Sequence, residues 1–381
     1  MTYNLNYISP QMKAILQPAI VNTHFSNKRL SIRSFRDAYI MPFYKWRESI
    51  GGVATNKREA IVDSRNAEWE ESFTPFVGKH YHIEHKKVIY IGVLVVGFGH
   101  CFTDDLRKLW FLKTEQYKLL LRDGAELVYT TDLNQPLPTY TKQILQYAGF
   151  DYKSAIHITE LTCFDEVFVP DNSFYAEAFG RCYTKEYLAS IGDIKQSISQ
   201  FSCNISVPRK IYLSRSKFSK RPESRSEQGE ETIEKQMQKI GFVSIIPEEH
   251  SFVEQVYMVQ HCEQLATTEG SVAHIAIFCR PQTKLYIFCK ARYLNFHQVA
   301  VNQVADLDIT YIEAHHSLKM GKEIPWYGPF YLCVTKYFEK FLGYKVPHIP
   351  FLLRLSFWKY MRVVPRTINK VFRILKIDKQ L

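Results

Sequence analysis

Apolar residues gather into short runs that alternate with amphipathic stretches from about residue 86 to residue 313. Short apolar runs between polar or Gly/Pro positions predict strands, and apolar positions repeating every three to four residues predict helices. Strands are expected at 87–96, 125–130, 155–159, 166–169, 210–213, 242–246, 265–267, 284–288 and 309–313. Helices are expected at 104–114, 140–147, 185–199, 230–240 and 251–260, the last with Ser251 and Glu254 as a capping box. This alternation predicts an α/β protein built from parallel βαβ units.

A chain of 381 residues is long for a single core and favours two domains. Pro208 marks a boundary between the two series of strands and helices. We therefore expect an N-terminal domain at 1–205, which includes the weakly patterned residues 1–85, and a C-terminal domain at 206–330. Residues 331–381 form a separate tail.

The positive charge is concentrated at one end of the chain. The net charge is +11, but residues 331–381 hold eleven Lys and Arg against only Glu339 and Asp378, which leaves the first 330 residues at +2. A nucleic-acid enzyme would carry its charge on the working face, so nucleic acid is not an expected partner.

The eight cysteines show neither a CxxC pair nor zinc-finger spacing, and several lie in apolar runs, as reduced core thiols do. The longest apolar run, 88–98, is too short to span a bilayer, and the first residues do not read as a signal peptide. These features predict a cytoplasmic protein.

Two segments predict an anion site. Leu265–Thr267 ends a strand, Glu269-Gly270-Ser271 turns the chain, and a helix containing His274 follows, so backbone N–H groups point outward at its start. The strand ending at Ser214 opens into a basic loop with Arg215, Lys220, Arg221 and Arg225. Facing strand ends of this kind suit a diphosphate, although an ordinary turn beside a solvated loop has the same pattern. In the first domain, Gly97 to His100 and Asp104 follow the strand at 87–96 and are expected to face this site.

Several of these blocks resemble glycosyltransferase family 61. Gly99 to Trp110 resembles the family's "GHF…E.L.RLW" segment, Arg209 to Arg215 its strand and basic loop, and Glu269 to His274 the bacterial "EGSALHN" form. The resemblance runs from about residue 88 to 315, with Gly229 where the family often has Asn.

The resemblance implies a GT-B fold, with two Rossmann-like domains facing a cleft. It also implies an inverting transfer from a nucleotide-sugar, UDP being the expected nucleotide, without an essential metal or other cofactor. Either His100 or Asp104 would be the base, unless His100 is structural and Asp104 only caps a helix. Arg215, Lys220, Arg221, Arg225, Glu269, Gly270, Ser271 and His274 would bind the donor.

The tail allows two interpretations that are not exclusive. Ile368, Val371, Phe372 and Leu375 share one helical face opposite Arg366, Lys370 and Arg373, as in a basic amphipathic helix on an anionic membrane. In the second interpretation, part of 331–360 is the helix that crosses back to the first domain, ahead of the membrane-touching end. The leading hypothesis is a transferase on the inner face of the cell membrane that extends a surface glycan, capsule or lipopolysaccharide, on a glycan or lipid-linked acceptor. The alternatives are a non-catalytic nucleotide-sugar-binding scaffold and a peripheral membrane protein with an unrelated core.

Overall fold

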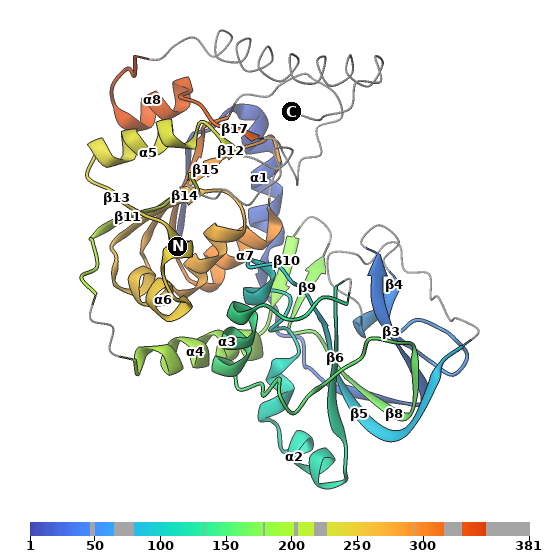
Figure 1. The fold of residues 1–381 in the computed structure, drawn as a ribbon. Helices are drawn as coiled ribbons and strands as arrows, with labels where there is room; N and C mark the ends of the chain where they lie inside the picture. The colour runs from blue at the N-terminus through green and yellow to red at the C-terminus, as the bar shows by residue number, and fades with distance from the viewer. Residues whose placement is uncertain are drawn as a thin grey trace, which may run out of the picture.

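The structure is a computed structural model that describes residues 1–45, 50–64, 80–132, 134–177, 180–201, 205–216, 227–293, 295–315 and 330–347. These residues form a mixed α/β protein with two six-stranded sheets, as the alternating pattern predicts. Figure 1 shows the two sheets in separate halves of the molecule, joined by helices. Among the described residues, no helix is long and apolar enough to cross a membrane.

The C-terminal sheet is entirely parallel, with strand order β1-β16-β15-β14-β11-β13. Its strands are β1 (Thr2–Tyr7), β11 (Lys210–Leu213), β13 (Val243–Ile245), β14 (Gln264–Thr268), β15 (Lys284–Cys289) and β16 (Asp308–Glu313). Its helices are α5 (Glu230–Lys239), α6 (Phe252–His261), α7 (Phe296–Val304) and α8 (Lys336–Leu342), with the 3-10 helix η7 (Ser271–Phe278). The capping box expected at the start of α6 is present, since Ser251 and Glu254 exchange hydrogen bonds.

Strand β1 corrects the expected domain division. The sequence pattern predicts that residues 1–85 belong to the N-terminal domain, but β1 pairs with β16 in parallel, with Thr2 opposite Asp308. The segment TYNLNY carries little apolar signal because it lies at an edge of the sheet, where backbone pairing and partial burial suffice. The boundary between 205 and 206 therefore does not separate the two sheets.

The N-terminal sheet is mixed, with strand order β4-β3-β8-β5-β6-β7. Its strands are β3 (Ile32–Lys45), β4 (Ile50–Ala54), β5 (His82–Leu94), β6 (Glu126–Thr131), β7 (Ile156–His157) and β8 (Thr162–Pro170). The four strands expected from the sequence, β5 to β8, are parallel where they pair, whereas β3 and β4 lie antiparallel at one edge. A third, small sheet has the order β2-β10-β9, from β2 (His24–Phe25), β10 (Gly180–Tyr183) and β9 (Phe174–Glu177).

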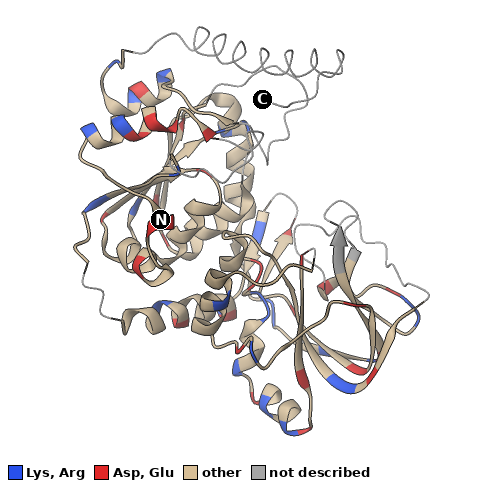
Figure 2. Cartoon of the chain, in the orientation of Figure 1, with Lys and Arg blue, Asp and Glu red and all other residues tan. Residues whose placement is uncertain are grey.

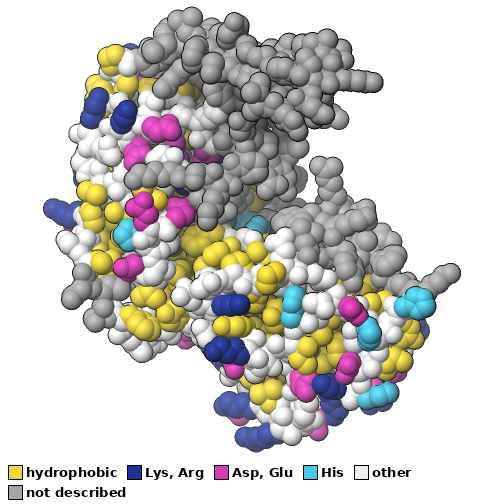
Figure 3. All heavy atoms as spheres, viewed as in Figure 1, with side chains coloured by type: hydrophobic (Ala, Val, Ile, Leu, Met, Phe, Trp, Pro, Cys, Tyr) yellow, Lys and Arg dark blue, Asp and Glu magenta, His cyan; other side chains and the backbone are white. Residues whose placement is uncertain are grey.

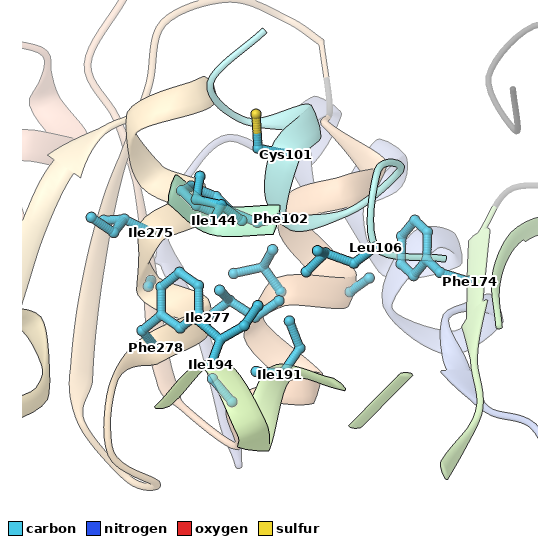
Figure 4. Close-up of a cluster of buried hydrophobic side chains, with 14 of the residues drawn as sticks. Cys101, Phe102, Leu106, Ile144, Phe174, Ile191, Ile194, Ile275, Ile277 and Phe278 are labelled. Carbon is cyan, nitrogen blue, oxygen red and sulfur yellow. The ribbon is translucent and has the colours of Figure 1, made fainter. Parts of the chain in front are cut away.

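A single apolar core lies between the two large sheets. Alternate residues of β5 and β11, Ile89 and Ile211 among them, point into it, while their neighbours Val88 and Tyr212 face two smaller cores on the outer sides. The helices α1 (Pro10–Asn22), α3 (Thr139–Tyr147), α4 (Lys185–Ser199), α6 and α7 also contribute to this core. Figure 4 shows its centre, where Phe102 and Leu106 of the N-terminal half meet Ile277 and Phe278 of η7.

The prediction of a helix at 104–114 is wrong. Residues 103–108 form turns between two 3-10 helices, η3 (His100–Phe102) and η4 (Leu109–Lys113), and α2 (Glu115–Arg122) begins only afterwards. The aspartates explain the difference: Asp105 accepts the backbone N–H of Val95 at 2.8 Å, and Asp104 accepts from the side chains of His100 and Thr103. Side chains that bond to nearby backbone and to each other compete with a regular helix.

The tail lies mostly outside the described residues. Its described helix, α8, packs against β1 and β16 of the C-terminal sheet, so this part does not have the position expected for a helix that crosses to the first domain. The amphipathic segment at 366–375 belongs to residues 348–381, which the structure does not describe, and its membrane role stays a prediction. Figures 2 and 3 show that the Lys and Arg of the described residues on this face are scattered and mixed with Asp and Glu.

The first testable prediction concerns Gly229, which precedes α5 in a left-handed conformation with φ of +86°. A Cβ there would lie 2.1 Å from the backbone oxygen of Leu332, whereas Gly149, with φ of +85°, has open space around it. We expect Gly149→Ala to lower the free energy of unfolding by about 1 to 2 kcal/mol through backbone strain alone. Gly229→Ala should cost about 1 to 3 kcal/mol more through the clash.

Urea unfolding of both variants measures this difference. Equal losses in the two variants would contradict the close approach of Leu332 to Gly229.

Candidate functional site

Two loops from opposite halves of the molecule meet at the candidate site. The loop Gly97–His100 follows β5, and the turn Glu269–Gly270 joins β14 to η7. Helices η3 and η7 are in contact, and a Cβ on Gly99 would lie 2.5 Å from Nδ1 of His274 and 3.1 Å from Cα of Ser271. The two loops therefore lie against one another, and Gly99 is the residue that permits their close approach.

Asp104 is an enclosed charge at the centre of this contact. Its Oδ2 lies 2.6 Å from Nδ1 of His100 and 3.9 Å from Nε2 of His297, and the carboxylate has no exposed surface. Burial by itself would raise the pKa of Asp104, but His297, His100 and Arg107 outweigh it and hold this pKa well below its usual range. Asp104 is therefore ionised at neutral pH and does not cap a helix.

Three histidines lie close together here, two of them from the C-terminal half. The ring centroid of His297 lies 5.7 Å from that of His100 and 6.2 Å from that of His274. His297 sits in the first turn of α7, whose N-cap is Asn295. The Nδ2 of Asn295 lies 3.1 Å from Nε2 of His274 and, since an amide nitrogen only donates, it identifies this Nε2 as the acceptor.

Glu269 is buried in the same turn. Its Oε1 accepts the backbone N–H of Asn295 at 3.0 Å, which ties the turn to the start of α7. Burial raises the pKa of Glu269 to about 7, and the Asn295 hydrogen bond and the charge of Lys290 limit the rise. A carboxyl group in this state changes its charge near neutral pH.

A second cluster lies beside Gly270. Lys290 directly follows β15, and its Nζ would be 2.9 Å from a Cβ on Gly270, whose φ is +134°. The same Nζ lies 2.8 Å from Oε1 of Glu227, and Nη1 of Arg215 lies 3.8 Å from that oxygen. Thr268 donates to the other oxygen of Glu227 at 3.1 Å. Two cations thus share one nearly buried carboxylate next to the turn.

Glu230 supports the strand end that carries Arg215. Its Oε1 accepts the backbone N–H of Arg215 at 2.9 Å and the hydroxyl of Tyr212 at 3.2 Å. Burial, and then the charge of Glu227, raises the pKa of Glu230 to about 8. Glu230 is therefore protonated over much of the neutral range.

Sequence reasoning located part of this site. The structure brings together His100, Asp104, Glu269, Gly270, Ser271 and His274, and it places Arg215 beside the same turn. Lys220, Arg221 and Arg225 fall in 217–226, outside the described residues. The sequence analysis missed Glu227, Lys290, Asn295 and His297. Lys290 offered a signal, because it ends a predicted strand at the same edge of the sheet as Ser214 and Glu269.

His100, Asp104 and His297 could also hold a metal ion. One ligand atom from each lies within 4.8 Å of the others. Two imidazoles and a carboxylate are a common ligand set for zinc and other divalent transition metals. The expectation of a metal-independent enzyme therefore needs a direct test.

Comparisons with known proteins agree with the resemblance found in the sequence. Residues 98–286 match the family model described as Glycosyltransferase 61. This range contains His100, Asp104, Arg215 and the turn at 269–274, whereas Lys290 and His297 lie beyond it. A search of curated proteins finds no match to the chain.

The raised pKa of Glu230 makes a stability prediction. The protonated carboxyl of Glu230 stabilises the folded state. This stabilisation should be fully present below the unfolded pKa of about 4.5 and should be lost as the pH rises through about 8. Glu230→Gln keeps an acceptor for Tyr212 and Arg215 but cannot ionise. We expect the free energy of unfolding of the wild type, relative to Glu230→Gln, to fall by at most about 5 kcal/mol across this range.

Urea unfolding at several pH values tests this, with Glu231→Gln on the exposed side of α5 as the control. A difference between wild type and Glu230→Gln that does not change with pH would contradict it.

Proposed function

This chain belongs to glycosyltransferase family 61 through residues 98–286, and from this premise we propose that it transfers a sugar from a nucleotide-sugar to an acceptor hydroxyl with inversion. The observation that carries the proposal is the His100–Asp104 pair, held at 2.6 Å against the glycine turn of the opposite half. In this proposal the base lies on one side of the contact between the two halves, and the diphosphate site lies on the other.

We propose His100 as the base and Asp104 as the residue that orients it. The side chain of His100 is 23% exposed, whereas that of Asp104 is fully enclosed, so only the imidazole reaches an acceptor. Asp104 engages Nδ1, which assigns the incoming proton to Nε2. An ionised carboxylate also stabilises the imidazolium that forms, as in other His–Asp pairs.

The donor diphosphate would lie at the Gly270 turn. Gly270 and Ser271 let the backbone approach the phosphates, and Arg215 and Lys290 supply positive charge for the leaving group. The acceptor oxygen forms a bond to the anomeric carbon, the bond from that carbon to the phosphate oxygen breaks, and the hydroxyl proton passes to His100. Glu227 balances the two cations while the site holds no diphosphate.

The wider assignment follows the family and the sequence. The two Rossmann-like sheets support a GT-B arrangement, and the scattered charge on the face drawn in Figure 3 supports a sugar rather than a nucleic acid as substrate. A surface glycan is the proposed acceptor, reached at the cytoplasmic face of the membrane through the basic tail. UDP is the proposed nucleotide, and no metal or other cofactor is required in this scheme.

Nucleotide release from UDP-, GDP- and CMP-sugars in the presence of candidate acceptors tests the base. We expect His100→Ala to lower kcat by about 10²- to 10⁴-fold, because it removes the proton acceptor. His85→Ala is the matched control, since His85 pairs with Asp165 at 3.1 Å on the exposed surface of the same half. Full activity in His100→Ala would refute the assignment.

The same assay with and without a chelator tests the metal. Activity that survives chelation supports the metal-independent scheme. Activity that is lost and then restored by a divalent ion would contradict the metal-independent scheme and would make His100, Asp104 and His297 candidate ligands.

Donor binding is tested separately by thermal shift with nucleotides. We expect Arg215→Ala and Lys290→Met each to weaken binding about tenfold or more, because each removes a charged contact to phosphate. Arg209→Ala is the matched control: Arg209 precedes β11, whereas Arg215 follows it, and Arg209 pairs with Glu263 in solvent. Donor binding without sugar transfer would favour the non-catalytic alternative.

A further inference from the structure

The small sheet β2-β10-β9 brings together a cysteine, a histidine and a glutamate from three strands. These are Cys182 of β10, His24 of β2 and Glu177 of β9, and one ligand atom from each lies within 4.8 Å of the others. Cys182 is buried, while His24 and Glu177 are exposed, so the group opens to solvent on one side. None of the three belongs to the proposed active site.

The distances fit a tetrahedral metal. Nε2 of His24 lies 3.6 Å from Sγ of Cys182. Around a tetrahedral zinc ion, with Zn–N of about 2.0 Å and Zn–S of about 2.3 Å, a nitrogen and a sulfur ligand lie roughly 3.5 Å apart. The Nε2–Sγ distance is close to this spacing, but Nδ1 lies 3.9 Å from the same sulfur, so the exposed ring would have to turn to direct Nε2 at a shared ion.

The other nitrogen of His24 is held as metal-bound histidines are held. Its Nδ1 lies 3.1 Å from the backbone oxygen of Asn22, and because that oxygen can only accept, Nδ1 carries the proton. The lone pair of the neutral ring is then on Nε2, the nitrogen nearer to the sulfur. A backbone carbonyl that fixes the tautomer in this way is the usual outer partner of a metal-binding histidine.

The backbone around the group fixes these positions. Cys182 and His24 are direct partners in the parallel pairing of β10 with β2, and the N–H of Ser26 donates to the oxygen of Tyr183 at 2.8 Å. A Cβ on Gly180 would lie 2.3 Å from the Asn22 oxygen, so a glycine is needed for that carbonyl to approach. Strand pairing thus fixes the backbone positions of Cys182 and His24 relative to one another.

We propose that His24, Glu177 and Cys182 bind a divalent transition metal ion, zinc in the first place, with water in the fourth position. The ion would clamp β2 to β9 and β10. Strand β10 contacts both α1 and α7, and Arg181 lies over the ring of Phe296 at 5.7 Å. Metal binding would therefore stiffen the sheet on which α7, the helix of His297, rests.

Cobalt substitution tests the site with the full chain, after treatment with a chelator. We expect Co²⁺ to give a thiolate-to-metal charge-transfer absorption that saturates at one ion, and Zn²⁺ to abolish it by displacement. Cys182→Ser and His24→Ala should lose the band, while Cys163→Ser and Cys333→Ser, two other partly exposed thiols, should keep it. Asp104→Asn should also keep the band, because the group of His100, Asp104 and His297 contains no sulfur ligand.

Two further measurements guard against a variant that does not fold. Glu177→Gln alters only an exposed side chain and should weaken cobalt binding about tenfold or more. Zn²⁺ should raise the Tm of Asp104→Asn but not that of the double variant Asp104→Asn/Cys182→Ser, which lacks a ligand at both groups. Absence of a thiolate band at saturating Co²⁺, or a band that persists in Cys182→Ser, would overturn the proposal.

Discussion

The enclosed charge of Asp104 is the interaction on which the arrangement of the two halves depends. An ionised carboxylate out of contact with water costs several kcal/mol unless nearby positive charge and hydrogen bonds compensate. Here the compensation comes from both halves, through His100 in its own loop and His297 on α7. The two loops must therefore remain together for this carboxylate to stay charged, and that requirement fixes where His100 sits relative to the Gly270 turn.

The apolar surroundings strengthen this constraint. The ring of Phe174 stacks on His297 at 5.7 Å, and Phe102 meets Phe278 edge to face at 5.2 Å across the shared core. In such a low-dielectric region each electrostatic contact is stronger than it would be in water. The core between the sheets and the charged site thus depend on one another. The apolar residues that exclude water also strengthen the electrostatic interactions of Asp104.

The sequence predicted the regular part of the fold because local pattern and tertiary role agree there. Helix α4 and strand β11 have the predicted bounds, since each buries one face in periodic fashion. The pattern failed where side chains or partners far along the chain decide the structure. The aspartates at 104 and 105 replaced a helix by turns, and β1 depends on pairing with a strand about three hundred residues away. His297 could not be identified for the same reason, since its partner Asp104 lies in the other half.

The place of β1 has a consequence for how the chain folds as it is synthesised. Thr2 is made first, yet its partner Asp308 emerges after most of the protein. Closing a flexible loop of this length costs roughly 5 kcal/mol of chain entropy, which falls sharply once the intervening segments have folded. The N-terminal sheet can assemble on the ribosome, whereas the edge of the other sheet stays open until β16 arrives. Strand β1 is thus made long before its partner, and its pairing has to wait until β16 has been synthesised.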